Sequence, residues 1–168
     1  MTDRVLARIW IGGELRRSES YKLVLAVNKA RVSVGMPGWE DILCRPMSIE
    51  GLMEGADEGI LHFEDVAAPD GDMPILTRVC RRLGLTYRHW HEATLEDGCC
   101  VEVWEPGMKE PVRLRGDPTD PFTHLIESLP VRLAIDHLRN GEIDAALDLL
   151  QRASPDIPEV PPLVVIDD

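Results

Sequence analysis

The sequence predicts an α+β fold, with helices packed on a mostly antiparallel sheet of four or five strands and an αα-hairpin after it. Three observations predict this class. Short segments with apolar residues at every second position recur along the chain, with turn residues between them. Two of these segments follow one another directly, as the strands of an antiparallel hairpin do. Apolar residues at helical spacing come between the early strands and then twice in succession near the C-terminal end.

The first third of the chain predicts a strand, a helix and a second, short helix. Residues 5–11 alternate in the manner of a strand, and the glycine pair after them ends the strand or permits a bulge. A helix is expected over residues 19–29. Residues 32–46 are rich in Gly and Pro and predict a loop, after which Ser48 opens the short helix.

The middle of the chain predicts one helix among three or four strands. The helix is capped by Asp70 or Asp72 and has Pro74 in its first turn. Turn residues between two of the strands indicate an antiparallel hairpin. The strands are expected over residues 60–66, 85–92 and 99–105, with a short fifth strand over residues 112–114.

The C-terminal third predicts a pair of helices and a tail. Apolar residues follow helical spacing in two runs, Val131, Ala134, Ile135 and Leu138 and then Ile143, Ala146, Leu147 and Leu150. Asn140-Gly141 separates the two helices. The chain therefore divides into a sheet domain over residues 1–116, a helical hairpin over residues 117–154 and an extended, Pro-rich acidic tail over residues 155–168.

The formal net charge of −12 is distributed unevenly. Residues 1–31 and 78–91 each carry +4, whereas residues 32–77 carry −9 and residues 92–168 carry −11. The acidic excess argues against binding to duplex DNA or to an anionic membrane, both of which need basic surface. It fits either a solvated surface that keeps the protein soluble or a surface that docks on a basic partner.

The cysteines and the hydropathy indicate a cytoplasmic protein. Four cysteines, Cys44, Cys80, Cys99 and Cys100, contain no Cys-x-x-Cys pair and are expected to be free, partly buried thiols. The apolar runs are too short to span a bilayer, and the N-terminal residues lack the apolar run of a signal peptide. No membrane partner is expected.

Three tryptophans are candidate partner-binding residues. Trp10, Trp90 and Trp104 each fall on the predicted strand side that carries charged neighbours, Arg88 among them. If the strands pair, this side forms one exposed aromatic patch, and Trp and Arg are the residues most often found as interface hot spots. The alternative is that helices cover this side and make it a second core layer.

Carboxylates on the helical hairpin form a second candidate binding surface. They are Glu127, Asp136, Glu142, Asp144 and Asp148. Carboxylates repeated along a helix imitate phosphate spacing and can occupy a basic nucleic-acid groove. The alternative is an ordinary solvated helix face.

His89 and His91 are the candidate metal ligands. Residues i and i+2 of a strand share a face, so the two imidazoles could share a metal ion with Cys99 across the predicted turn. Spacing places only two ligands, and the alternative is a hairpin with half-exposed histidines and no metal. We expect no cofactor, and because no catalytic signature is present we nominate no catalytic residue.

Three short motifs resemble a known group of proteins. They are Ile9–Gly13, Tyr87–His89 and Glu102–Met108. With the helical hairpin and the Pro-rich end, they look like the small acidic proteins encoded on bacterial plasmids, integrative elements and phages. This setting often includes inhibitors of host defence, such as anti-CRISPR proteins. The resemblance carries over no catalytic residue, and Cys99-Cys100 stands where a tyrosine-rich strand is typical of the group.

These features together predict a small acidic interaction module of a mobile genetic element rather than an enzyme. The expected action is to inhibit or modulate a basic, nucleic-acid-binding host complex by surface docking. Its partner would be a basic protein or ribonucleoprotein, with no direct contact to duplex DNA. Two alternatives stay open: a metal-binding protein or metal-dependent enzyme centred on His89 and His91, and a structural or regulatory homodimer.

Overall fold

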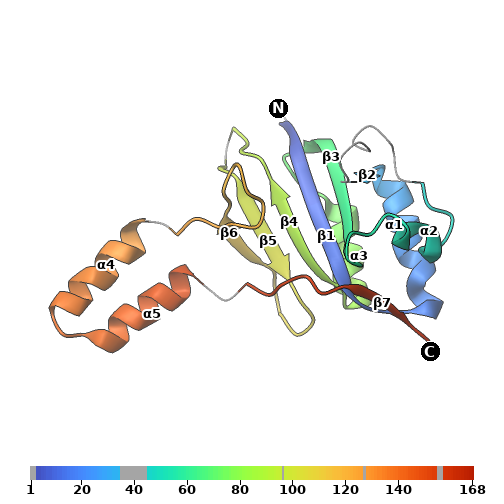
Figure 1. Cartoon of the computed structure of the whole chain (residues 1–168). Coiled ribbons are helices and arrows are strands. Elements are labelled where there is room, and N and C mark those ends of the chain that lie inside the picture. The colour runs from blue at the N-terminus through green and yellow to red at the C-terminus, as the bar shows by residue number, and fades with distance from the viewer. Residues whose placement is uncertain (1–2, 35–44, 96, 127, 155–156) are drawn as a thin grey trace.

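The computed structural model describes residues 3–34, 45–95, 97–126, 128–154 and 157–168, and it confirms the α+β class (Figure 1). The strands are β1 (Arg4–Arg16), β2 (Ser33–Val34), β3 (Leu61–Pro69), β4 (Thr86–His91), β5 (Cys100–Trp104), β6 (Val112–Arg115) and β7 (Leu163–Ile166). The helices are η1 (Arg17–Glu19), α1 (Ser20–Ala30), α2 (Ile49–Met53), α3 (Pro74–Leu83), α4 (Ser128–Arg139) and α5 (Ile143–Ala153). The sheet is open, with strand order β2-β3-β1-β4-β5-β6, every pair in that path is antiparallel, and β7 is parallel to β1.

Strand β1 is the centre of the sheet. It pairs with β3 on one side and β4 on the other, so that Ile9 lies opposite Phe63 and His89. The alternation of its residues sends Ile9 and Ile11 to one face of the sheet and Trp10 to the other. The glycine pair at 12–13 does not end this strand, which continues to Arg16.

One face of the sheet is covered by α1, α2 and α3 (Figure 1). These helices bury apolar stripes against the strands, with Leu23 and Val27 from α1 and Leu76 and Cys80 from α3. Helix α3 begins at Pro74, as the sequence predicts, and ends at Leu83, where the C-cap residue Gly84 has a left-handed conformation (φ +69°). Its N-cap is Met73 rather than Asp70 or Asp72.

The opposite face of the sheet is covered by irregular chain rather than by helices. A second buried cluster lies there, consisting of Trp10, Trp90, Cys99, Val101 and Val103. Phe122 lies over Trp10 with ring centroids 4.8 Å apart, and Ile157 and Val160 pack against the same cluster. The central strands β1 and β4 are therefore largely buried on both faces of the sheet.

The C-terminal residues are more than the extended tail that the sequence predicts. Residues 157–168, here named the strap, cross back over the sheet and end in β7, beside the C-terminal end of β1 (Figure 1). A Cβ atom on Gly12 would lie 1.6 Å from the carbonyl oxygen of Pro161, so a side chain at position 12 would displace the strap. The segment expected as a loop over residues 32–46 also contributes β2, while Trp39 and Cys44 lie outside the described residues.

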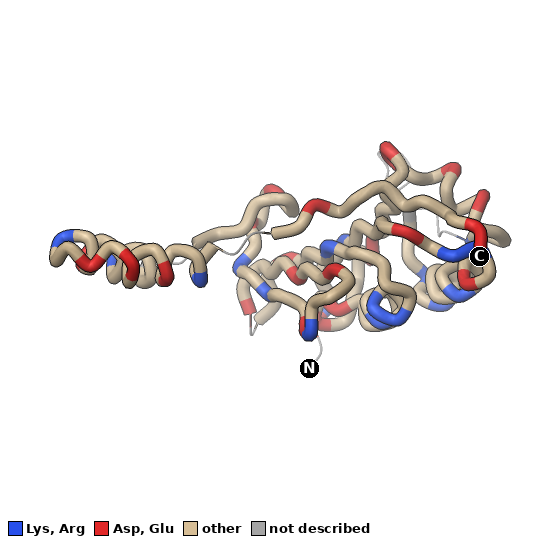
Figure 2. Tube along the Cα trace, turned by 90° about the horizontal axis from the view of Figure 1, so that it is seen from below, with Lys and Arg blue, Asp and Glu red and all other residues tan. Residues whose placement is uncertain are grey.

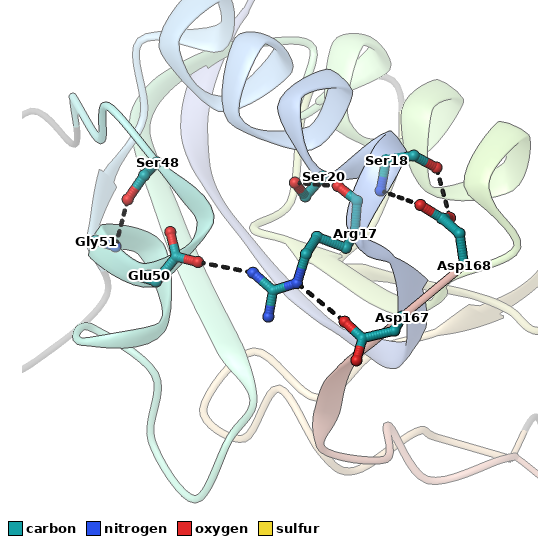
Figure 3. A network of polar contacts seen from close by, with 8 residues as sticks. All are labelled: Arg17, Ser18, Ser20, Ser48, Glu50, Gly51, Asp167 and Asp168. Atoms are coloured by element: carbon teal, nitrogen blue, oxygen red, sulfur yellow. Dashed lines mark hydrogen bonds and ion pairs between the residues drawn. The ribbon is translucent and has the colours of Figure 1, made fainter.

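Polar contacts fix the end of the strap to the start of the first helical region (Figure 3). Arg17 reaches Asp167 at 3.3 Å and Glu50 at 3.1 Å. Ser18 donates its hydroxyl hydrogen to the Asp168 carboxylate at 2.6 Å. Exposed ion pairs contribute little to the free energy of unfolding, so the main effect of these contacts is to fix the position of the strap end.

Helices α4 and α5 form the predicted antiparallel hairpin, here named the arm. The arm extends away from the sheet (Figure 1), and its two helices pack on each other with Ala134 and Ala146 buried between them. The turn between the helices uses Gly141, whose φ of +78° favours glycine.

Candidate functional site

The arm presents an apolar surface that the described part of the chain does not cover. Helical spacing places Ile135 and Leu138 of α4 beside the packed seam, and Ile143, Leu147 and Leu150 of α5 lie beside the same seam. Because the helices are antiparallel, these five residues flank the seam on one side of the arm, here named the arm face. Each is between 36% and 60% exposed.

The acidic residues of the arm do not form one surface. Asp136 pairs with Arg139 at 3.2 Å, Asp148 pairs with Arg152 at 2.8 Å, and Glu142 contacts His137. Helical spacing points Asp136 of α4 away from α5, and it points Asp144 and Asp148 of α5 away from α4. Asp136 therefore lies on one edge of the arm, and the other two carboxylates lie on the opposite edge. Acidic and basic residues are mixed along the arm (Figure 2), and residues 128–153 carry a net charge of only −1. Glu127 lies outside the described residues.

The expectation of an exposed tryptophan patch is wrong. Trp10, Trp90 and Trp104 are only 8%, 3% and 7% exposed. Trp104 lies opposite Tyr87 in the register and so faces α3, whereas Trp10 and Trp90 are on the other side of the sheet. The cause is the chain around residues 117–124, which folds over Trp10 and Trp90.

Arg88 holds that covering segment in place. It donates to the carbonyl oxygens of Pro121 at 3.0 Å and Phe122 at 2.6 Å, and Trp90 donates its indole hydrogen to the carbonyl oxygen of Asp117 at 3.0 Å. Burial lowers the pKa of Arg88 below its ordinary value. Arg88 does not pair with Glu102 across the hairpin, because the two side chains point to opposite faces of the sheet.

The arm is therefore anchored on both sides to the same buried cluster. The chain before it is held by Arg88 and Trp90, and the strap after it packs Ile157 and Val160 on that cluster. Trp10, Trp90 and Arg88 thus hold the segments that come before and after the arm rather than forming a surface of their own.

A polar cluster lies on the helix-covered face of the sheet. Glu102 accepts hydrogen bonds from the Tyr87 hydroxyl and from Nε of Arg113, both at 2.7 Å, and stands opposite His89 in the register. Burial favours the neutral carboxyl, but these two donors outweigh it and hold the pKa of Glu102 below its ordinary value. Burial and the Glu102 carboxylate both raise the pKa of Tyr87. Burial lowers the pKa of His89 to about 4.

The proposed metal ligands are not brought together as a set. The rings of His89 and His91 lie 5.9 Å apart on one face, but Cys99 is on the other, with its Sγ 3.0 Å from the carbonyl oxygen of His91. Cys100, not Cys99, stands opposite His91. Within the described ranges, no three His, Cys, Asp or Glu side chains are grouped to hold a metal ion.

The described cysteines are free thiols rather than nucleophiles. Burial raises the pKa of Cys99 to about 11, and it raises the pKa of Cys80 and Cys100 as well. The thiolate, which is the reactive form, is therefore suppressed at neutral pH.

The buried neutral imidazole of His89 predicts a specific acid sensitivity. The unfolded chain takes up the proton near pH 6.5 and the folded protein only near pH 4, so this contribution to stability is present above pH 6.5 and is lost as the pH falls towards 4. The expected loss is up to about 3 kcal/mol. Titration of the His89 ring by NMR checks the cause, and a midpoint near 6.5 would contradict it.

Comparison with known proteins finds no matching family model, and no significant match among curated proteins or solved structures. Across the described parts of the chain, no helix has both the length and the apolar character needed to cross a membrane.

The sequence predicts the apolar stripes of the arm helices, but it does not predict that one side of these stripes stays uncovered. The Tyr87–Glu102–Arg113 cluster was not anticipated at all.

Proposed function

We propose that the protein is a non-enzymatic interaction module that docks a partner protein through the arm face. The observation that carries this proposal is the uncovered apolar side of an arm that extends away from the sheet (Figure 1). Amphipathic helices ordinarily turn their apolar stripe towards a core. A contiguous exposed apolar surface on a folded protein is typical of an interaction site.

The partner we propose is a basic protein or ribonucleoprotein in the cytoplasm of a bacterial host. The chain carries −12 in total and the arm only −1, so the excess acid lies on the rest of the molecule. Such a charge attracts a basic partner over a distance, while desolvated apolar contacts supply most of the binding energy. Docking would block the partner's function in the manner of an anti-CRISPR inhibitor, which the resemblance of the sequence supports.

Capture from a lysate of host cells tests this function. The full chain is immobilised in three forms: native, Leu147→Asp on the arm face, and Leu133→Asp on the opposite side of the arm. We expect one basic polypeptide to be captured by the native chain and by Leu133→Asp but not by Leu147→Asp. Capture that is insensitive to Leu147 would contradict docking through the arm face.

The charge distribution predicts how salt acts on this association. Raising the ionic strength from 0.05 M to 0.5 M is expected to slow association about tenfold or more, because screening shortens the range of steering. The dissociation rate should change little, since it depends on apolar contacts of the arm face. Surface plasmon resonance measures both rates, and an association rate independent of salt would rule out a basic partner.

Light scattering distinguishes the homodimer alternative from docking to a different partner protein. If a second copy covers the arm face, the native chain is a dimer and Leu147→Asp is a monomer. A native monomer at high concentration favours a different partner.

A further inference from the structure

A second site lies on the helix-covered face of the sheet, beside the start of α3. It is a cleft of about 530 Å³ with His89 and Glu102 at its buried floor. Asp72, Arg81 and Glu110 are exposed at its rim. Docking through the arm face leaves this cleft without a role.

The floor of the cleft contains an acceptor that lacks a donor. His89 is only 4% exposed, and its Nε2 has no hydrogen-bond partner among the residues that the structure describes. Burial keeps the ring neutral, so one of its two nitrogens carries a lone pair, and we assign that lone pair to the unpartnered Nε2. Both Glu102 oxygens already accept hydrogen bonds, from Tyr87 and Arg113. An unpaired acceptor that is buried destabilises the protein, and a ligand that donates a hydrogen bond to it would remove that penalty.

The charges around the cleft indicate which donor fits. Arg113 is neutralised by its ion pair with Glu102 at 2.7 Å. The remaining rim charges are two carboxylates, Asp72 and Glu110, against one guanidinium, Arg81. A negative rim above a buried acceptor favours a positively charged donor and disfavours an anion.

We propose that this cleft binds a cationic nitrogen group, an amine or a guanidinium, which donates a hydrogen bond to Nε2 of His89 and is held by Asp72 and Glu110. The group can belong to a free small molecule or to a Lys or Arg side chain of a protein. This site does not depend on the function proposed for the arm.

NMR of the full chain tests the proposal with three probes. They are ethylguanidinium, its neutral isostere ethylurea, and a capped Gly-Arg-Gly peptide. We expect ethylguanidinium to shift the ¹⁵N resonance of His89 Nε2, and ethylurea to have little effect. Tighter binding of the peptide than of ethylguanidinium assigns the site to a protein side chain, and the reverse assigns it to a small molecule. A response to ethylurea equal to that of ethylguanidinium, or no response to either cation, overturns the proposal.

Two variants separate ligand binding from folding. His89→Phe removes the acceptor and should abolish binding of ethylguanidinium. Should that variant not fold, Glu110→Gln at the exposed rim is expected to weaken binding about fivefold, since one rim charge is lost. Glu159→Gln, an exposed substitution in the strap, is the matched control and should bind as the native chain does. Unchanged binding in Glu110→Gln and in a folded His89→Phe would place the probe elsewhere.

Discussion

Replacing Leu147 with Asp is expected to weaken partner binding about thirtyfold or more, which corresponds to about 2 kcal/mol. Leu147 is half-exposed near the middle of α5, between Ile143 and Leu150 on the arm face. An Asp there places a charge among apolar side chains that docking would remove from water. Calorimetric titration with the captured partner measures the loss.

The same substitution should leave the fold intact. Exposed positions away from the core change the free energy of unfolding by about 0.5 kcal/mol or less. Leu133→Asp makes the same chemical change on the opposite side of the arm, at a residue of similar exposure, and is expected to keep native affinity. A Leu147→Asp variant that binds as well as Leu133→Asp would show that the arm face is not the docking surface.

Replacing Leu163 with Ala is expected to destabilise the whole protein by about 2–5 kcal/mol. Leu163 is the buried residue of β7, and its backbone N–H donates to the carbonyl oxygen of Gly59 at 2.8 Å. The truncation leaves a cavity where the strap meets the sheet and loosens the contacts of Ile157 and Val160 with the tryptophan cluster. Urea unfolding, followed by tryptophan fluorescence, measures the change.

Val164 offers a matched control in the same strand. It is 51% exposed, so Val164→Ala should change the free energy of unfolding by about 0.5 kcal/mol or less. Equal effects of the two substitutions would mean that β7 is not part of the folded core.

The fold class could be predicted because most elements carry a local signal. The alternation over residues 5–11 and the helical spacing on both sides of Gly141 depend on neighbours in sequence, and both appear in the structure. β7 could not be predicted in this way. Its short apolar run follows several prolines, and it becomes a strand only because the strap returns to the end of β1, a contact between distant parts of the chain.

The candidate site was harder to predict, because exposure is set by tertiary packing. Trp10 and Trp90 do share a face, as the alternation predicts, but residues near Phe122 and Val160 cover them. Trp104 falls on the other face because the pairing of β5 puts it opposite Tyr87. The arm is the opposite case. Its apolar stripes predict burial, but the described part of the chain leaves the arm face exposed.

The structure shows that the acidic excess lies mainly outside the arm. The sequence places −11 in residues 92–168, and it predicts that loops and the helical hairpin carry most of the acidic excess. Most of that excess lies before and after the arm, and the acids of the arm are largely paired with its own basic residues. In the proposed function, long-range attraction of the partner therefore belongs to the sheet domain, and the arm contributes apolar contacts.

Site-specific photo-crosslinking in host cells tests the arm face most directly. A photoreactive amino acid is placed at position 147 on the arm face, at position 133 on the opposite side, and at exposed position 95 between β4 and β5. We predict a crosslink to a different, basic polypeptide from position 147 and none from positions 133 and 95. Crosslinks of equal yield from all three positions, or none from position 147, would contradict the claim that the arm face docks a partner.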